Sequence, residues 1–347
     1  MWGIGEVVRP SGGTSGVGRR ALVALALIGA ALAIAPLAFG MFDRGPKGAQ
    51  LMAEFKPFMT DARLSGFQRH IADIDAAVRE TAGPVARRLE GRGAAAHERF
   101  DRRFTGFAEF RRAWGPIHAD MKDLLDTIQA NTVNYQAVVA LPSFKLFPWF
   151  FVIPGALVAL LALAALLAAR LRPAVRWALV VVGIGLVLAP VAFEMFDRAP
   201  KGATMMKAFK TIETRPKVEQ MQGYFSTIAV GQGALRLDVV PALRDSGLST
   251  RQIARRFPAL TTLNRRWIGI LNDLTPMIGA MSDNVDNYQA VAGLPAFGLF
   301  PWFFVLPGLL IAGLALLPVR RGGRKAAPAT AGGPLPTPST PRQEAHR

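Results

Sequence analysis

Residues 41–48 read Met-Phe-Asp-Arg-Gly-Pro-Lys-Gly, and residues 195–202 read Met-Phe-Asp-Arg-Ala-Pro-Lys-Gly. Further along, the stretch Phe-Pro-Trp-Phe-Phe-Val begins at residue 147 and again at residue 300. The copies are offset by 154 and 153 residues, so the segments between them have almost the same length. Matching stretches at a constant offset are typical of an internal duplication. The sequence therefore predicts two tandem parallel repeats, at residues 19–170 and 171–319.

Each repeat is bounded by two apolar stretches whose interiors lack ionisable side chains. A bilayer core of about 30 Å is crossed by about 20 helical residues, and backbone amides in lipid must be paired within the helix. Each repeat contains an even number of these stretches, so both repeats have the same orientation. We therefore expect an all-α polytopic membrane protein with four transmembrane helices, at about 21–42, 147–169, 175–195 and 300–319.

The first apolar stretch follows Arg19 and Arg20, and two other interpretations of it exist. It resembles a cleavable signal peptide, and the paired arginines resemble a twin-arginine export signal. Pro36 directly follows the only small-residue cleavage site, at 33–35, and the third apolar stretch has the same ending deep inside the chain. We interpret the first stretch as a retained signal anchor.

The distribution of charge predicts the orientation in the membrane. The chain has 347 residues and a net charge of +17. Three short flanks, up to Arg20, from Arg170 to Arg176 and after residue 318, carry net charges of +2, +3 and +5, whereas the long segments mix both signs. Because basic flanks stay on the cytoplasmic side, we expect both termini in the cytoplasm of a bacterial plasma membrane and both long segments outside. This distribution requires no nucleic-acid partner.

The long segments, residues 43–146 and 196–299, have apolar side chains at spacings of three and four, which is typical of amphipathic helices. Each segment is expected to form its own extracytoplasmic bundle of three to five helices, with Trp114 and Trp267 buried. Two further regions complete the chain, a flexible cytoplasmic arm at 1–18 and a disordered cytoplasmic tail at 320–347.

Catalytic, cofactor and metal motifs are absent from the sequence. The lack of cysteine excludes disulfides, thiolate-bound zinc, iron–sulfur clusters and thiol nucleophiles, and the four histidines lack paired ligand spacing. The pairs Arg102-Arg103 and Arg255-Arg256 lie beside aromatic residues with core spacing, so we expect them on a solvated edge. The sequence predicts a non-enzymatic protein without a cofactor, although a carboxylate pair assembled from distant residues would leave no local signature.

The repeated stretches predict one specific site. Both lie at the outer ends of predicted spans, so in each half they should pack into a rigid collar that joins the external bundle to the membrane helices. Four basic residues are candidates for binding lipid phosphates or an anionic ligand: Arg44, Lys47, Arg198 and Lys201. Simple interfacial anchoring is the alternative. The expected structural residues are Asp43, Pro46, Asn134, Tyr135, Trp149, Asp197, Pro200, Asn287, Tyr288 and Trp302, with Pro46 ending the outgoing helix.

These features favour a binding or scaffold module of the cell envelope. The external helical domains would bind a protein, a lipid or a wall component, and the expected partners are membrane lipids and an envelope protein or a second copy of the chain. A transport or channel subunit with a path between the repeats is the alternative. Against it, the span interiors offer no Asp, Glu, Lys, Arg or His to bind an ion or relay protons.

Overall fold

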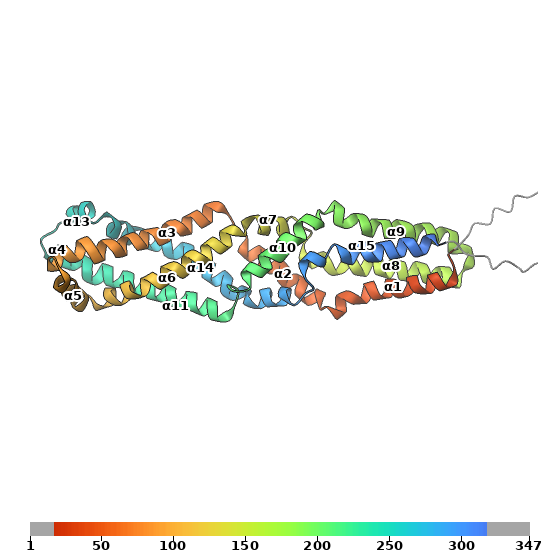
Figure 1. Ribbon diagram of the computed structural model, residues 1–347, viewed down its shortest axis with the longest axis horizontal. Coiled ribbons are helices and arrows are strands. Elements are labelled where there is room, and N and C mark those ends of the chain that lie inside the picture. Colours follow the sequence, from red (N-terminus) through yellow and green to blue (C-terminus); the bar gives the residue numbers. More distant parts are fainter. Residues whose placement is uncertain (1–16, 318–347) are drawn as a thin grey trace, which may run out of the picture.

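The computed structural model describes residues 17–317, and this part of the chain is all-helical without a β-strand. The tail expected at 320–347 lies outside it, as does the arm expected at 1–18 except for its last two residues. Figure 1 shows an elongated rod. One end of the rod consists of α1 (Arg19–Ala38), α8 (Phe147–Leu167), α9 (Arg172–Ala192) and α15 (Trp302–Leu316).

These four helices, some with the short turns before them, are long and apolar enough to cross a membrane, as the sequence predicts. The outgoing helix α1 ends four residues earlier than expected. Gly40 has a φ of 61°, and Glu194 after α9 has a φ of 53°, and a left-handed residue ends a helix. Pro46 lies inside the next helix, α2 (Met41–Phe55). The expectation that Pro46 stops the outgoing helix is therefore wrong, because the left-handed residue Gly40 ends the helix before the chain reaches Pro46.

Small residues bring the apolar helices together in pairs. α1 packs on α8 and α9 packs on α15, while η3 (Ala169–Leu171) connects α8 to α9. A Cβ atom at Gly29 would lie 2.7 Å from the Gly155 carbonyl oxygen, and one at Gly183 would lie 2.7 Å from the Gly308 carbonyl oxygen. Glycine is required at these crossings because any larger side chain would push the backbones apart.

Buried phenylalanines fill the space between the two halves where α8 and α15 begin. The ring centroids of three pairs, each with one member from each half, are close: Phe144–Phe297 at 5.7 Å, Phe147–Phe300 at 5.4 Å and Phe151–Phe304 at 4.7 Å. All six rings are buried. Aromatic pairs at these distances pack favourably. The two halves therefore meet through an apolar contact along these three pairs.

Four long helices form the distal part of the rod: α3 (Asp61–Glu80), α6 (Thr105–Ala130), α11 (Arg215–Ala234) and α14 (Pro258–Ala292). α3 and α11 each pack against both α6 and α14. The two long segments therefore build one shared bundle, whereas we expected one bundle from each segment. Two amphipathic helices alone leave part of each apolar stripe uncovered, and here the helices of the other half cover it.

Equivalent polar contacts tie the halves together across this bundle. Asp273 on α14 accepts a hydrogen bond from Arg63 at 2.8 Å and lies 2.8 Å from His70 Nε2, both on α3. Asp120, at the equivalent position of α6, accepts a hydrogen bond from the Tyr224 hydroxyl on α11 at 2.7 Å. The contacts with His70 and Arg63 lower the pKa of Asp273. The hydrogen bond from Tyr224 likewise lowers the pKa of Asp120, so both carboxylates stay ionised and hold the other half in register.

The far end of the rod consists of short helices and single π-helical turns. They are η1 (Thr81–Val85), α4 (Ala86–Glu90), α5 (Ala94–Arg103), η4 (Leu235–Val239), α12 (Val240–Asp245) and α13 (Thr250–Arg256). Between this end and the bundle core, Trp114 and Trp267 are 4% and 7% exposed. The predicted burial of both tryptophans is confirmed.

Candidate functional site

The collar is the layer of helices between the apolar end of the rod and the distal bundle (Figure 1). It consists of α2, α7 (Thr132–Val139), α10 (Met195–Phe209) and the end of α14, with the turns η2 (Phe144–Leu146) and η5 (Phe297–Leu299). α2 packs against η2 of its own half and against α14 of the other half, and α10 packs against η5 and α7 in the same way. The helices α2 and α10, which follow the apolar helices α1 and α9, therefore each contact both halves.

The repeated stretches of each half lie in contact. The rings of Phe42 and Trp149 are 5.5 Å apart edge to face, and those of Phe196 and Trp302 are 5.8 Å apart. A Cβ atom at Gly45 would lie 2.7 Å from the Phe144 carbonyl oxygen. These contacts fix α2 to α8 and α10 to α15, so the collar is continuous with the apolar helices.

Two of the four predicted cations join the halves. Arg44 donates a hydrogen bond to the carbonyl oxygen of Gly293, which follows the last residue of α14. Arg198 donates at 2.8 Å to the carbonyl oxygen of Ala140, which follows the last residue of α7. A cation at a helix C-terminus is favoured by the helix dipole and by the unpaired carbonyls. The geometry therefore gives both arginines a partner within the chain.

The other two predicted cations lie on the surface. Lys47 pairs with Asp43 at 3.0 Å and Lys201 pairs with Asp197 at 2.6 Å, one helical turn apart in each case. Such exposed pairs contribute little to stability. Pro200, like Pro46, lies inside its helix. Contact of Lys47 and Lys201 with lipid headgroups stays a prediction.

The remaining polar collar residues face inward. The Tyr135 hydroxyl donates to the Met52 carbonyl oxygen, and the Tyr288 hydroxyl donates to the Met206 carbonyl oxygen at 2.6 Å. These bonds tie α7 to α2 and α14 to α10 within each half. The asparagines bond along their own segments, Asn134 to Asn131 and Asn287 to Asn284, both at 3.0 Å.

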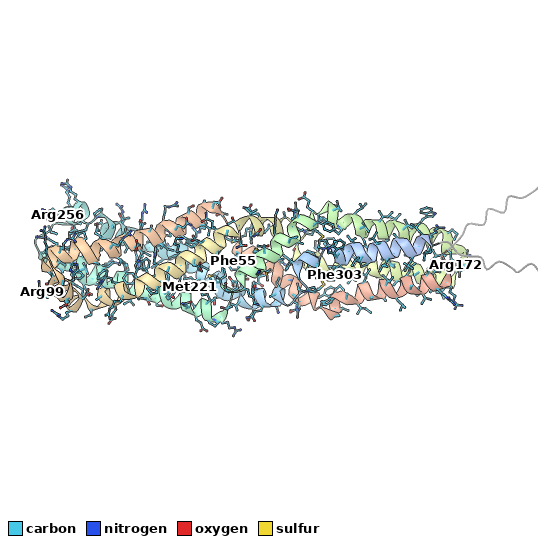
Figure 2. The ribbon with its side chains drawn as sticks, viewed as in Figure 1. Phe55, Arg99, Arg172, Met221, Arg256 and Phe303 are labelled. Carbon is cyan, nitrogen blue, oxygen red and sulfur yellow. The ribbon has the colours of Figure 1, made fainter. Side chains whose placement is uncertain are left out.

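A second feature, which the sequence did not predict, lies at the far end of the rod. We define the arginine cap as the exposed arginines of residues 81–104 and 235–257. These ranges contain no lysine and, with five acidic residues, have a net charge of +6. The arginines are Arg87, Arg88, Arg92, Arg99, Arg102, Arg103, Arg236, Arg244, Arg251, Arg255 and Arg256. In Figure 2, Arg99 and Arg256 lie at one end of the rod and Arg172 at the other.

Both halves contribute to the cap and meet there. Arg88 of α4 donates a hydrogen bond at 3.0 Å to the carbonyl oxygen of Ser246, which follows α12. Glu90 pairs with Arg99 at 3.7 Å and with Arg103 at 3.0 Å. Among the residues that the structure describes, the side chains of seven cap arginines form neither a hydrogen bond nor an ion pair: Arg87, Arg92, Arg236, Arg244, Arg251, Arg255 and Arg256. Most of the positive charge of the cap is therefore available to a partner.

The sequence does not show that the arginine-rich ends of the two halves meet, because that contact is made only in the tertiary structure. Arg102-Arg103 and Arg255-Arg256 are solvent-exposed, as expected of a solvated edge, and each pair ends a short helix, where basic side chains are favoured. The signal available in the sequence was the absence of lysine from both ranges, together with the arginine pair that recurs at 102–103 and 255–256. Lysines occur elsewhere, as at Lys56 and Lys210.

No protein-family model matches this chain and no curated protein matches it at a significant level, so its function has to be inferred from its own geometry.

Proposed function

We propose that the protein is a non-enzymatic, membrane-anchored scaffold of the cell envelope whose arginine cap binds an anionic polymer of the cell wall. The observation that carries this proposal is the cap itself. Its arginines are gathered at the end of the rod opposite the four apolar helices (Figure 2). A molecule of this shape holds a charged surface away from the membrane in which it is anchored.

The cap chemistry suits an extended polyanion. A guanidinium presents planar paired donors that match the oxygens of phosphate and carboxylate groups, and it is always charged. Unpartnered arginines on both halves, for example Arg92, Arg236 and Arg255, offer several such contacts along one partner. Binding through many exposed charges is strong at low salt and weakens as the ionic strength rises.

Internal duplication supports a scaffold in which both halves contribute equally. The glycine crossings, the Phe pairs and the carboxylates of Asp120 and Asp273 all recur at equivalent positions. The proposed scaffold consists of the repeat at 19–170 followed by the repeat at 171–319. The two repeats interlock in one rod, and this interlocking provides the stiffness that a scaffold needs.

A transport or channel subunit remains the second candidate function, but the packing favours it less. The three Phe pairs fill the junction between the halves with apolar rings, of which Phe304 is only 2% exposed. A path for a polar substrate along this junction would have to separate these rings. The scaffold proposal requires no such movement.

The proposed topology has both termini in the cytoplasm and the arginine cap outside the plasma membrane. The wild-type chain contains no cysteine, so one introduced residue reports a single position. A cysteine at Ala95, which is exposed in α5, should react with a membrane-impermeant maleimide in intact cells. A cysteine at Ser15 should react only after the membrane is opened. The reverse pattern would invert the proposed orientation and place the cap in the cytoplasm.

Removal of cap charge should weaken polyanion binding. The full-length chain in detergent is titrated with long-chain inorganic polyphosphate at low salt. The test variant carries four substitutions: Arg92→Gln, Arg236→Gln, Arg251→Gln and Arg255→Gln. Since each surface cation near an anionic partner contributes about 1 kcal/mol, we expect affinity to fall roughly hundredfold or more.

A control variant removes the same charge outside the cap through Arg69→Gln, Arg265→Gln, Lys56→Gln and Lys145→Gln. These four residues are exposed and form no ion pair among residues 17–317. We expect binding within about threefold of the wild type, because the partner contacts the cap. Equal weakening in both variants would show that net charge alone drives binding, and would reject the cap as the site.

A further inference from the structure

A groove opens at the collar of the second half. It has a volume of about 700 Å³ and is bordered by α10, the turn into α11, the end of α14 and the segment up to Phe297. Lys207 and Lys210 line it and are exposed. Tyr288 and Glu213 line its inner wall. The groove therefore combines two free cations, near the C-terminal end of α10, with polar groups beneath them.

Glu213 is the unusual residue of this groove. It is 2% exposed, and its Oε2 atom has no hydrogen-bond partner among residues 17–317. Buried polar atoms in native proteins almost always have a partner, so this oxygen is poised for a ligand. Burial raises the pKa of Glu213 to about 8. At neutral pH the carboxyl is therefore protonated and can donate a hydrogen bond.

An apolar pocket adjoins the groove. Its volume is about 110 Å³ and it lies between α1 and α15, where its lining includes Leu32, Phe300 and Phe303. Pro295 lines both the groove and the pocket. Phe303, labelled in Figure 2, lies between the apolar end of the rod and the collar. The polar groove and the apolar pocket therefore meet at Pro295.

The first half provides an internal comparison. Its equivalent groove has a volume of about 220 Å³ and is lined by one lysine, Lys56, with Tyr135 in the place of Tyr288. Ala53 occupies the position equivalent to Lys207. Met59, which is 2% exposed, occupies the position equivalent to Glu213. Lys207 and the unpartnered carboxyl of Glu213 are therefore specific to the second half, whereas Lys210 has a counterpart in Lys56.

We propose that the second-half groove binds one anionic phospholipid, with its phosphate held by Lys207, Lys210 and Glu213 and an acyl chain in the pocket beyond Pro295. The lysines supply charge complementarity, and the protonated carboxyl donates to a phosphate oxygen without repelling it. The apolar pocket lies against helices that are suited to a bilayer, so an acyl chain reaches it from the membrane. This site is independent of the arginine cap.

The test uses the full-length chain in a neutral detergent and short-chain phosphatidylglycerol as the probe, with bound lipid counted by native mass spectrometry. Phosphatidylcholine of the same chain length and inorganic phosphate are the comparison ligands. We expect one phosphatidylglycerol per chain, bound at least roughly tenfold more tightly than either comparison ligand. Inorganic phosphate that binds as well as the lipid would overturn the role of the apolar pocket, and equal binding of phosphatidylcholine would overturn the role of charge.

Matched variants locate the site. The double variant Lys207→Gln/Lys210→Gln should weaken phosphatidylglycerol binding roughly tenfold or more, because each cation near an anionic headgroup contributes about 1 kcal/mol. The double variant Lys56→Gln/Lys145→Gln removes the same charge from the first half and should bind like the wild type. Equal losses in the two variants would place the lipid elsewhere.

Substitutions of Glu213 test the hydrogen bond separately from the charge. Glu213→Gln keeps a neutral donor and should retain binding. Glu213→Met reproduces the first-half residue and should weaken binding roughly tenfold to hundredfold, in the range of one hydrogen bond to a charged group. Unchanged binding by the methionine variant would remove Glu213 from the site. All variants are first compared by circular dichroism with the wild type, and the control variants test whether the fold survives loss of charge at the collar.

Discussion

Replacement of Glu213 by methionine should stabilise the protein by about 4 kcal/mol more at pH 8 than at pH 4.5. The physical reason is burial. The carboxyl has an ordinary pKa of 4.5 in the unfolded chain, and burial raises it to about 8 in the folded chain. The folded state therefore holds a proton that the unfolded state releases. As pH rises from 4.5 to 8, ionisation increasingly favours the unfolded state, and wild-type stability falls through this window.

The measurement is chemical unfolding of the full-length chain in detergent at pH 4.5, 6 and 8. The methionine variant should lose most of the decline in stability that the wild type shows with rising pH. Glu219→Met is a suitable control, because Glu219 is exposed on α11 and its removal should leave the pH dependence unchanged. A wild-type and a Glu213→Met chain with parallel pH profiles would mean that Glu213 is already ionised in the folded protein.

Truncation of Trp114 to alanine should destabilise the protein by about 3–5 kcal/mol, the usual range for a large buried aromatic side chain. Trp114 packs against Phe110 and His118, with ring centroids 5.7 Å and 5.6 Å away. Its indole nitrogen also donates a hydrogen bond to Asp75 at 3.0 Å. The substitution therefore leaves a cavity between α3 and α6 and removes a bond that joins them.

Two further variants separate packing from hydrogen bonding. Trp114→Phe keeps most of the buried ring and removes the donor, so it should cost about 1–2 kcal/mol. Ile268→Ala, at a residue that is 63% exposed on α14, should change stability by less than about 0.5 kcal/mol. The free energy of unfolding is measured by the same denaturant titration. A Trp114→Ala chain as stable as the Ile268→Ala chain would show that the region around Trp114 is loosely packed.

The predicted collar cations illustrate the limits of sequence reasoning at a site. Basic residues at the end of a span indicate headgroup contact on composition alone. The sequence could not show that Arg44 reaches Gly293, because that partner lies 249 residues away. Nor could it show that Glu213 is buried in the wall of a groove. A single carboxylate next to an isoleucine forms no sequence pattern that distinguishes a buried residue from an exposed one. Its difference from Met59 at the equivalent position was the only signal available.

The sequence by itself determined the four apolar helices, the all-helical class of the described residues and the burial of Trp114 and Trp267. Each of these follows from composition or from periodicity within one helix, which are local properties. The tertiary structure alone decided that the long segments share one bundle and that their arginine-rich ends meet. Periodicity shows which face of a helix is buried but not which helix covers it. Two similar halves have similar stripes, so partners within and between halves are indistinguishable until the whole chain packs.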